Sequence, residues 1–286
     1  MKLKLQFIVV ILIAILVILS SCRKEPPDYP YRIVATIPTG NSVEAVTILP
    51  NGEYVYVTNV FTDHVTDHVL VIRASDNMVI DTIHVGHCPD GIATLPNGDY
   101  VYVANANSYD ISVIRTSDNT VVQTIPVGMI PHDIAVTPNG DYIYVTNVGS
   151  IYISVIRTSD NVFMDTIIVD YVCPGATALP SGDYVYVTSS SNNYVLVIRT
   201  SDNTIIDTIP VGIGPIGIAT LPNGNFVYVV NRDGNTVSVI RTADNVVTNT
   251  IPVGHYPESI AGLPNGEYYT ETLSLWTRLI CRVIML

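Results

Sequence analysis

The stretch that decides the fold reads Leu95-Pro-Asn-Gly-Asp-Tyr-Val-Tyr-Val-Ala-Asn105. Its first half is typical of a tight turn, because Asn and Gly accept the positive φ angles that such a connection requires. Its second half alternates large residues with Val, which is the period-two pattern of a half-buried β-strand. Variants of the stretch, spaced first by 46 and then four times by 42 residues, begin at Leu49, Thr137, Leu179, Leu221 and Leu263. The chain is therefore predicted to be a repeat protein.

Each repeat offers four short strands, which we name A to D in chain order. In the second repeat we expect them at 91–95, 100–105, 111–116 and 121–127. Pro-Asn-Gly joins A to B and Ser-Asp-Asn joins C to D, and both connections have the length of a hairpin, so the strands must pair antiparallel. Four antiparallel strands in about 42 residues, repeated along a chain, are typical of the blades of a β-propeller.

The elements Tyr56-Val-Thr-Asn59 and Tyr144-Val-Thr-Asn147 sharpen this interpretation. With them the chain resembles the YVTN-type β-propeller repeat family of bacterial and archaeal surface and periplasmic proteins, over roughly residues 31–267. The resemblance implies an all-β propeller of four-stranded antiparallel blades. It implies little about function, because one fold supports many activities.

Five complete blades and a partial sixth are expected within a propeller domain of residues 32–286. The blades are expected at about 41–86, 87–128, 129–170, 171–212, 213–254 and, for the partial one, 255–286. The tail from Tyr268 to Leu286 matches no other blade, and another reading frame restores a blade-like pattern, so a frameshift in a parent of about seven blades is one hypothesis. If the tail is genuine, Leu275–Leu286 is expected to supply a strand C and Tyr31–Gly40 the closing strand D, which hides open sheet edges.

The N-terminus is interpreted as an export signal. Lys2 and Lys4 precede a 15-residue apolar run, Leu5–Leu19, which is short for a membrane span but suits a signal peptide. The following Leu19-Ser-Ser-Cys22 resembles the lipobox of bacterial lipoproteins, which implies that residues 1–21 are removed and that Cys22 is lipidated. Residues 22–31 then form a Pro-containing tether. We expect a lipid-anchored, extracytoplasmic protein of the cell envelope, either periplasmic or at the cell surface.

A formal net charge of −12 disfavours nucleic-acid partners, because an acidic surface repels phosphate backbones. Two repeated side chains are interpreted as structural. The paired Tyr residues of strand B are expected to pack blade against blade, and the Arg that ends strand C is expected to pair with the Asp of the next turn. These Arg–Asp pairs are Arg73–Asp76, Arg115–Asp118, Arg157–Asp160, Arg199–Asp202 and Arg241–Asp244.

The variable D–A and B–C loops share one face of a propeller, and loops on a rigid scaffold commonly carry function. The low-ranking candidates for ligand binding in these loops are His87, Asp90, His132, Asp133, His255 and Glu258. His and carboxylates are metal ligands, but His132 lies three places later in its repeat than His87 and His255, so polar loop residues that face water are the favoured interpretation.

A duplicated Thr-Asp-His-Val insertion in the first B–C loop adds weak metal-ligand candidates, namely Asp63, His64, Asp67 and His68. Replication slippage in an exposed loop is the simpler explanation of the duplication. No cofactor motif is recognised in the chain, and no metal is assigned.

The sequence favours a non-catalytic binding or scaffolding module whose loop face takes an envelope protein, a glycan or a small ligand. The alternative is a propeller enzyme, or a subunit resembling those of quinoprotein dehydrogenases, with a metal at the channel mouth. A third possibility is a surface-layer structural protein.

Overall fold

The computed structural model describes residues 35–40, 42–60, 67–169, 172–262, 268–273 and 281–285. The expected signal peptide, Cys22 and the tether lie outside these ranges, as do Asp63 and His64 of the inserted loop. No described helix is long and apolar enough to cross a membrane.

The described chain forms five four-stranded antiparallel sheets and a sixth sheet of three strands. The strands are β1 Ser42–Ile48, β2 Tyr54–Val60, β3 His68–Arg73, β4 Met78–His84, β5 Pro89–Thr94, β6 Tyr100–Asn105, β7 Asp110–Arg115, β8 Thr120–Pro126, β9 Pro131–Val136, β10 Tyr142–Asn147, β11 Tyr152–Arg157, β12 Val162–Ile168, β13 Ala176–Ala178, β14 Tyr184–Ser189, β15 Tyr194–Arg199, β16 Thr204–Pro210, β17 Pro215–Thr220, β18 Phe226–Asn231, β19 Thr236–Arg241, β20 Val246–Pro252, β21 Pro257–Gly262, β22 Tyr268–Leu273 and β23 Cys281–Met285.

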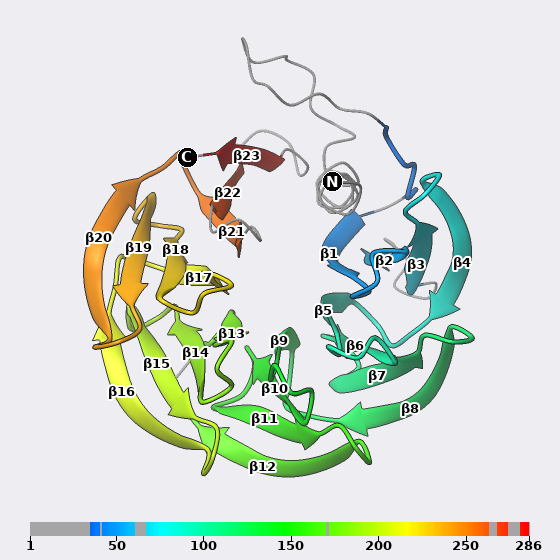
Figure 1. The fold of residues 1–286 in the computed structure, drawn as a ribbon, viewed down its shortest axis with the longest axis horizontal. Helices are drawn as coiled ribbons and strands as arrows, with labels where there is room; N and C mark the ends of the chain where they lie inside the picture. Colours follow the sequence, from blue (N-terminus) through cyan, green and yellow to red (C-terminus); the bar gives the residue numbers. More distant parts are fainter. Residues whose placement is uncertain are drawn as a thin grey trace.

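The sheets are the blades of a β-propeller, as the sequence predicts. Figure 1 shows them radiating from an axis, with strand A of each blade innermost and strand D at the rim; the sheets β1–β4 and β21–β23 stand at the two ends of an open ring. Strands of one blade pair antiparallel in sequence order, and each strand A packs beside the strand A of the next blade. In the second blade, the expected strands agree with β5–β8 to within two residues.

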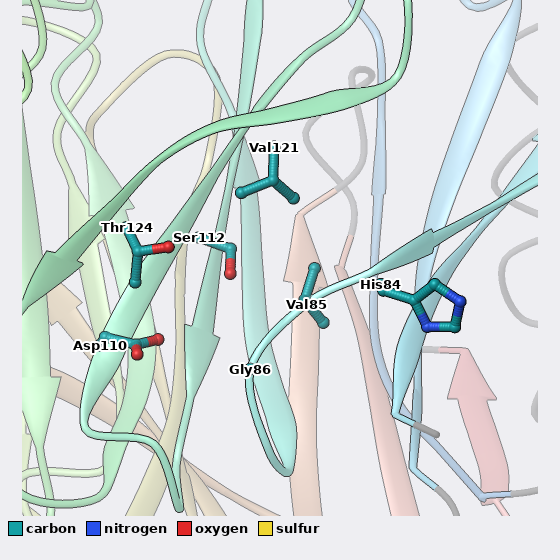
Figure 2. A pocket seen from close by; sticks show the side chains of 7 residues that line it. All are labelled: His84, Val85, Gly86, Asp110, Ser112, Val121 and Thr124. Carbon is teal, nitrogen blue, oxygen red and sulfur yellow. The ribbon is translucent and has the colours of Figure 1, made fainter. Parts of the chain in front are cut away.

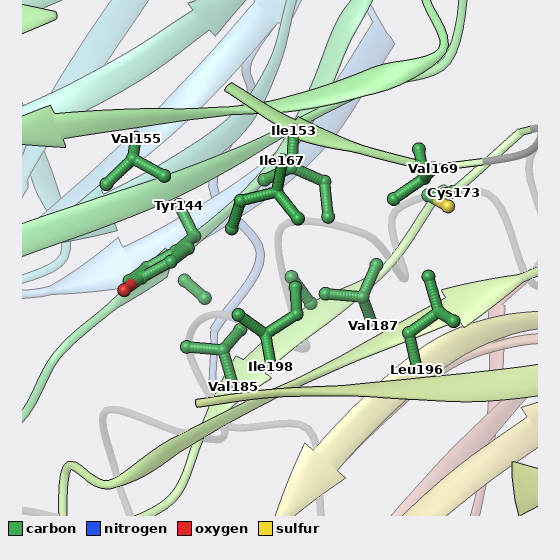
Figure 3. Close-up of a cluster of buried hydrophobic side chains, with 12 residues drawn as sticks. Tyr144, Ile153, Val155, Ile167, Val169, Cys173, Val185, Val187, Leu196 and Ile198 are labelled. Carbon is green, nitrogen blue, oxygen red and sulfur yellow. The ribbon is translucent and has the colours of Figure 1, made fainter. Parts of the chain in front are cut away.

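The blades are held together by apolar layers between neighbouring sheets. Figure 3 shows one such layer, in which Ile153 and Ile167 of the third blade face Val187 and Ile198 of the fourth. A single four-stranded sheet leaves both its faces exposed to water, so stacking each sheet against the next is what removes this surface. The hydrophobic core is thus a series of layers around the ring.

The Tyr residues of strand B belong to this core, as predicted. The second Tyr of each pair is buried in four blades, and these residues are Tyr56, Tyr102, Tyr144 and Tyr186. Each hydroxyl donates a hydrogen bond of 2.6–2.8 Å to the side-chain oxygen of an Asn in the C–D turn of the next blade. The ring fills the layer while its polar tip finds a partner, which is how a buried Tyr avoids a desolvation penalty.

The two ends of the chain differ from the expected closing blade. The tail does form strands, with β23 pairing as the third strand beside β22, so the expectation of a strand C within 275–286 is confirmed for 281–285. Residues 35–40 form no strand, so the expectation of a closing strand D is wrong for this segment. Ile37 is nevertheless buried against Val55, Val57 and Ile72 of the first blade. The Ile residues of four strands D, namely Ile83, Ile125, Ile167 and Ile209, are buried in the same way against the next blade. The packing of a strand D is thus repeated by a segment that is itself not a strand.

Candidate functional site

The two faces of the propeller differ in how regular they are. On one face, the A–B and C–D turns repeat the same chemistry in blade after blade. The predicted Arg–Asp pairs are all formed, at N–O distances of 2.6–2.8 Å. The hydrogen bond from Arg115 holds the pKa of the Asp118 carboxyl down at about 2. Because both partners are exposed, such a pair orders the turn more than it stabilises the fold. On this face, the described turn residues repeat from blade to blade, and no blade differs from the others in a way that marks a binding site.

The opposite face carries the variable D–A and B–C loops, and at its centre lies a cluster of ionisable side chains. His132, the second residue of β9, has its Nε2 atom 3.6 Å from Asp90 Oδ2 in the second blade. Its Nδ1 atom lies 2.8 Å from the carbonyl oxygen of Pro174 in the fourth blade. A carbonyl can only accept, so Nδ1 carries the proton and Nε2 faces Asp90. His132 therefore connects three consecutive blades.

Asp133 follows His132 and turns inward. Its Oδ2 atom accepts a 2.9 Å hydrogen bond from the backbone N–H of Ala176, and its Oδ1 atom accepts one of 2.8 Å from that of Ile134. Burial raises the pKa of the Asp133 carboxyl, against the effect of these two donors. Asp133 thus joins the third blade to the fourth and is a structural group at the base of the cluster.

The Asp90 carboxyl of this face also has a raised pKa. Burial raises its pKa to about 6, His132 acts in the opposite direction, and the nearby Glu44 and Asp133 raise it further. Its side chain still keeps 31% exposure and that of His132 keeps 42%, so both can be reached from solvent. A partly desolvated carboxylate among other acids attracts a cation or a protonated amine.

The repeat positions add one residue to this cluster. The three His residues do not share a repeat position, as the sequence indicated; His132 instead occupies the position held by Asp90 in the second blade and by Glu258 in the sixth. Glu44 holds the same position in the first blade, five residues before the Leu of the Leu-Pro-Asn-Gly turn. Sequence reasoning missed Glu44, although counting back from each turn would have found it.

The remaining candidates lie apart from this cluster. The backbone N–H of His87 donates a 2.7 Å hydrogen bond to Ser108 Oγ. Burial raises the pKa of the Asp110 carboxyl in the second blade, and the nearby His87 side chain acts in the opposite direction. Glu258 lies 3.3 Å from the Arg232 guanidinium, which also stacks over Tyr256 at 5.8 Å. His255 lies just before Tyr256, in the D–A loop that enters the sixth blade. The six candidates are thus divided among three places.

The inserted loop is described only in part. Asp67 is buried and accepts a 2.7 Å hydrogen bond from the backbone N–H of Cys88, and His68, also buried, begins β3. Asp67 therefore anchors the next D–A loop. Within the described ranges, no three His, Cys, Asp or Glu side chains gather closely enough to hold a metal ion.

Two small hollows lie on the described surface. One of about 290 Å³ lies at the seam of the first two blades; in Figure 2 its lining includes Asp110, Ser112 and Thr124, with the His84 ring turned outward. A second, of about 210 Å³, lies among the A–B turns near Pro50 and Asn97. Both volumes are below the range of about 300–1,000 Å³ in which pockets enclose a drug-sized molecule.

Exposed apolar side chains also gather on the loop face. Met129 and Ile130 lie in the D–A loop that enters the third blade, while Ile151 and Ile168 lie at the same end of that blade; we call these four residues the blade-3 patch. Ile130 has a φ of 53°, a conformation that a β-branched residue rarely adopts. The bond of 2.8 Å from the Val148 N–H to the Ile130 carbonyl oxygen holds the loop in this shape.

No family model matches the chain, and no curated protein matches it. Among solved structures, it is similar to a protein of unknown function from Desulfotomaculum acetoxidans, with a TM-score of 0.69 and 20% identity over 79% of this chain and 77% of that chain. It is also similar to a chain of the hydrazine synthase of Kuenenia stuttgartiensis, with a TM-score of 0.59 and 18% identity over 87% of this chain and 99% of that one. At such identities the likeness shows the fold alone.

Proposed function

We propose that this protein is a non-catalytic binding or scaffolding module of the cell envelope, and that its D–A/B–C loop face is the binding surface. The proposal is supported chiefly by the contrast between the two faces. The turn face repeats one set of turn residues, whereas the loop face differs from blade to blade and combines the cluster of Glu44, Asp90 and His132 with exposed apolar side chains. Variation on a uniform scaffold is what a recognition surface requires.

The location is proposed from the N-terminal sequence. The apolar run that ends in Leu19-Ser-Ser-Cys22 supports export and lipidation. The Tyr-Val-Thr-Asn elements support a propeller of the YVTN type, which would then be tethered outside the cytoplasm. The anchor would hold the propeller beside a membrane, where a bound partner would be concentrated.

Photo-crosslinking in the producing cells tests the loop face. The photoreactive analogue p-benzoylphenylalanine replaces Tyr109, an exposed aromatic residue of the second B–C loop, and in a matched strain it replaces the exposed Asn97 of an A–B turn. We expect adducts, detected by a mass shift, at position 109 and none at position 97. Adducts at position 97 alone, or at neither position, would overturn the proposal.

Metal analysis of the purified full chain separates this proposal from an enzyme with a metal at the channel mouth. We expect less than one-tenth of an equivalent of any metal. A stoichiometric Ca²⁺ or transition-metal ion that is lost in the Asp90→Asn variant would favour the enzyme instead.

A further inference from the structure

The repeats provide a control for each exposed residue on the loop face. Ile168, the last residue of β12, corresponds to Pro126, Pro210 and Pro252 in three other blades. Ile151 corresponds to Tyr109, Asn193 and Asn235, as shown by the equivalent backbone hydrogen bonds that these residues accept from the end of strand D. The fourth and fifth blades fold with Asn and Pro at these two positions, so large apolar side chains there are not required by the architecture.

The blade-3 patch is continuous and held in place by local hydrogen bonds. The carbonyl oxygen of Ile151 accepts a bond of 2.9 Å from Val169, the neighbour of Ile168. Ser150 Oγ accepts one of 2.8 Å from the backbone N–H of Met129. Ile151 and Ile168 keep 60% and 62% exposure, and Met129 keeps 53%. The patch is an ordered apolar surface open to solvent, and such surfaces on soluble domains mark interaction sites.

Negative charge borders this patch on the axial side. His132, in β9, is three residues after Met129 of the preceding loop, and three residues of extended chain span at most about 10 Å. His132 faces Asp90, which in turn lies near Glu44 and Asp133. An extended ligand that covers Met129 therefore reaches His132 and the Asp90 carboxylate beside it within about three or four residues of its own length, in a protein whose net charge is −12.

We propose that the blade-3 patch and the Asp90–His132 pair together bind an extended peptide segment of a partner protein, with an apolar side chain on the patch and a Lys or Arg beside Asp90. This inference rests on the proposed function and specifies the partner of the same loop face. The apolar contact supplies affinity, while the carboxylates select a basic segment and repel an acidic one.

The test uses the purified full chain in detergent and three fluorescein-labelled decapeptides, whose binding is followed by fluorescence anisotropy. The first peptide alternates Lys with Ile and Phe, the second replaces each Lys by Glu, and the third replaces each Ile and Phe by Ser. We expect saturable binding of the first, with affinity that falls as salt is raised, and binding at least about tenfold weaker for the other two. Equal affinity for the Lys and Glu peptides would overturn the proposal.

The double variant places at both positions residues that the fourth and fifth blades already carry, so the fold should tolerate it. The double variant Ile151→Asn/Ile168→Pro is expected to weaken binding of the first peptide by about tenfold or more. Asp90→Asn is expected to weaken it and to reduce its salt dependence. Ile213→Ser is the matched control, because Ile213 is 61% exposed on the same face of the fifth blade, and it should leave affinity within about twofold. Unchanged affinity in the double variant would refute the assignment.

Photo-crosslinking distinguishes a failure of the peptide assignment from a failure of the proposed binding function of the loop face. Adducts at position 109 without peptide binding would leave the loop face as the binding surface and remove only the peptide assignment. Absence of both would remove both proposals.

Discussion

The Asn in the middle of each C–D turn shows how one residue type can serve two needs. Asn119, Asn161, Asn203 and Asn245 all have φ near 55°, a conformation that Asn tolerates better than most residues. Each also accepts the Tyr hydroxyl of the preceding blade, and three of the four donate to an Asp of that blade's strand D. The turn residue is therefore also the link between blades.

Removing a single hydroxyl tests this link. Tyr144→Phe leaves Asn203 Oδ1 without its 2.8 Å donor, and we expect it to lower the free energy of unfolding by roughly 1–2 kcal/mol. Chemical denaturation followed by circular dichroism measures the loss. In the background of Asn203→Gly, which keeps the positive φ, the same change should cost much less. Equal losses in both backgrounds would show that the bond contributes nothing.

The Asp90 carboxyl makes stability depend on pH. Its pKa is raised from 3.8 to about 6 in the folded chain, with burial as the main cause, Glu44 and Asp133 adding to it and His132 opposing it. Between these two values the folded protein binds more protons than the unfolded chain, so this group's contribution to stability falls as pH rises from about 4 to 6. Asp90→Asn should therefore raise the free energy of unfolding at pH 7.5 by roughly 1–2 kcal/mol and leave it unchanged near pH 4. Denaturation curves at both pH values check this, and a constant difference would contradict it.

At the scale of elements, strand D shows how an exposed sheet edge is protected against pairing with the edge of another sheet. The register between strands C and D shifts at the same step in five blades, so that one residue of strand D bulges outward. The strand is rich in exposed Val and Ile, which would favour pairing with another edge. A bulge disrupts the regular row of backbone groups that such pairing needs. The repeated bulge is consistent with protection of the rim against association.

Residues 35–40 form no strand, and their contribution to the stability of the fold depends on the side chain of Ile37. Ile37 is 3% exposed in the apolar layer of the first blade, as Ile125 is in a layer between blades. Ile37→Ala is expected to cost about 2–4 kcal/mol, similar to Ile125→Ala, because each leaves a cavity against strand B. Thr36→Ala, at an exposed neighbour, is the control for the measurement by chemical denaturation. A loss for Ile37→Ala no larger than that of the control would show that the segment does not seal the first blade.

At the scale of the whole molecule, the proposed lipid anchor leads to a prediction about where in the cell the propeller is found. Cys22→Ser should abolish incorporation of a fatty-acid label and move the protein out of the membrane fraction, since acyl chains contribute about 0.8 kcal/mol per buried CH₂ and the acidic propeller has no charge attraction for anionic lipid. Metabolic labelling and cell fractionation measure both effects. Retention of the label in the variant would show that Cys22 is not the modified residue.

Much of the architecture could be predicted from the sequence, because repeats, turns and strands are local patterns. Three features depend only on residues a few places apart, and all three are found in the structure: the Pro-Asn-Gly and Asp-Asn turns, the alternation of strand B and the Arg–Asp pairs. The candidate site was predictable only in part. The sequence pointed to Asp90, His132 and Asp133 as loop residues, but it indicated neither their contact nor the participation of Glu44.

The sequence by itself determined that this chain is built from blades of four antiparallel strands and that two kinds of turn alternate with two kinds of variable loop. Only the tertiary structure decided which loop residues meet. Asp90 and His132 are one repeat apart, and whether such residues touch depends on the angle and offset between neighbouring sheets. Those are set by the packing of whole apolar layers, a collective quantity that no short stretch of residues encodes. The same packing decides that Ile37 is buried without belonging to a strand.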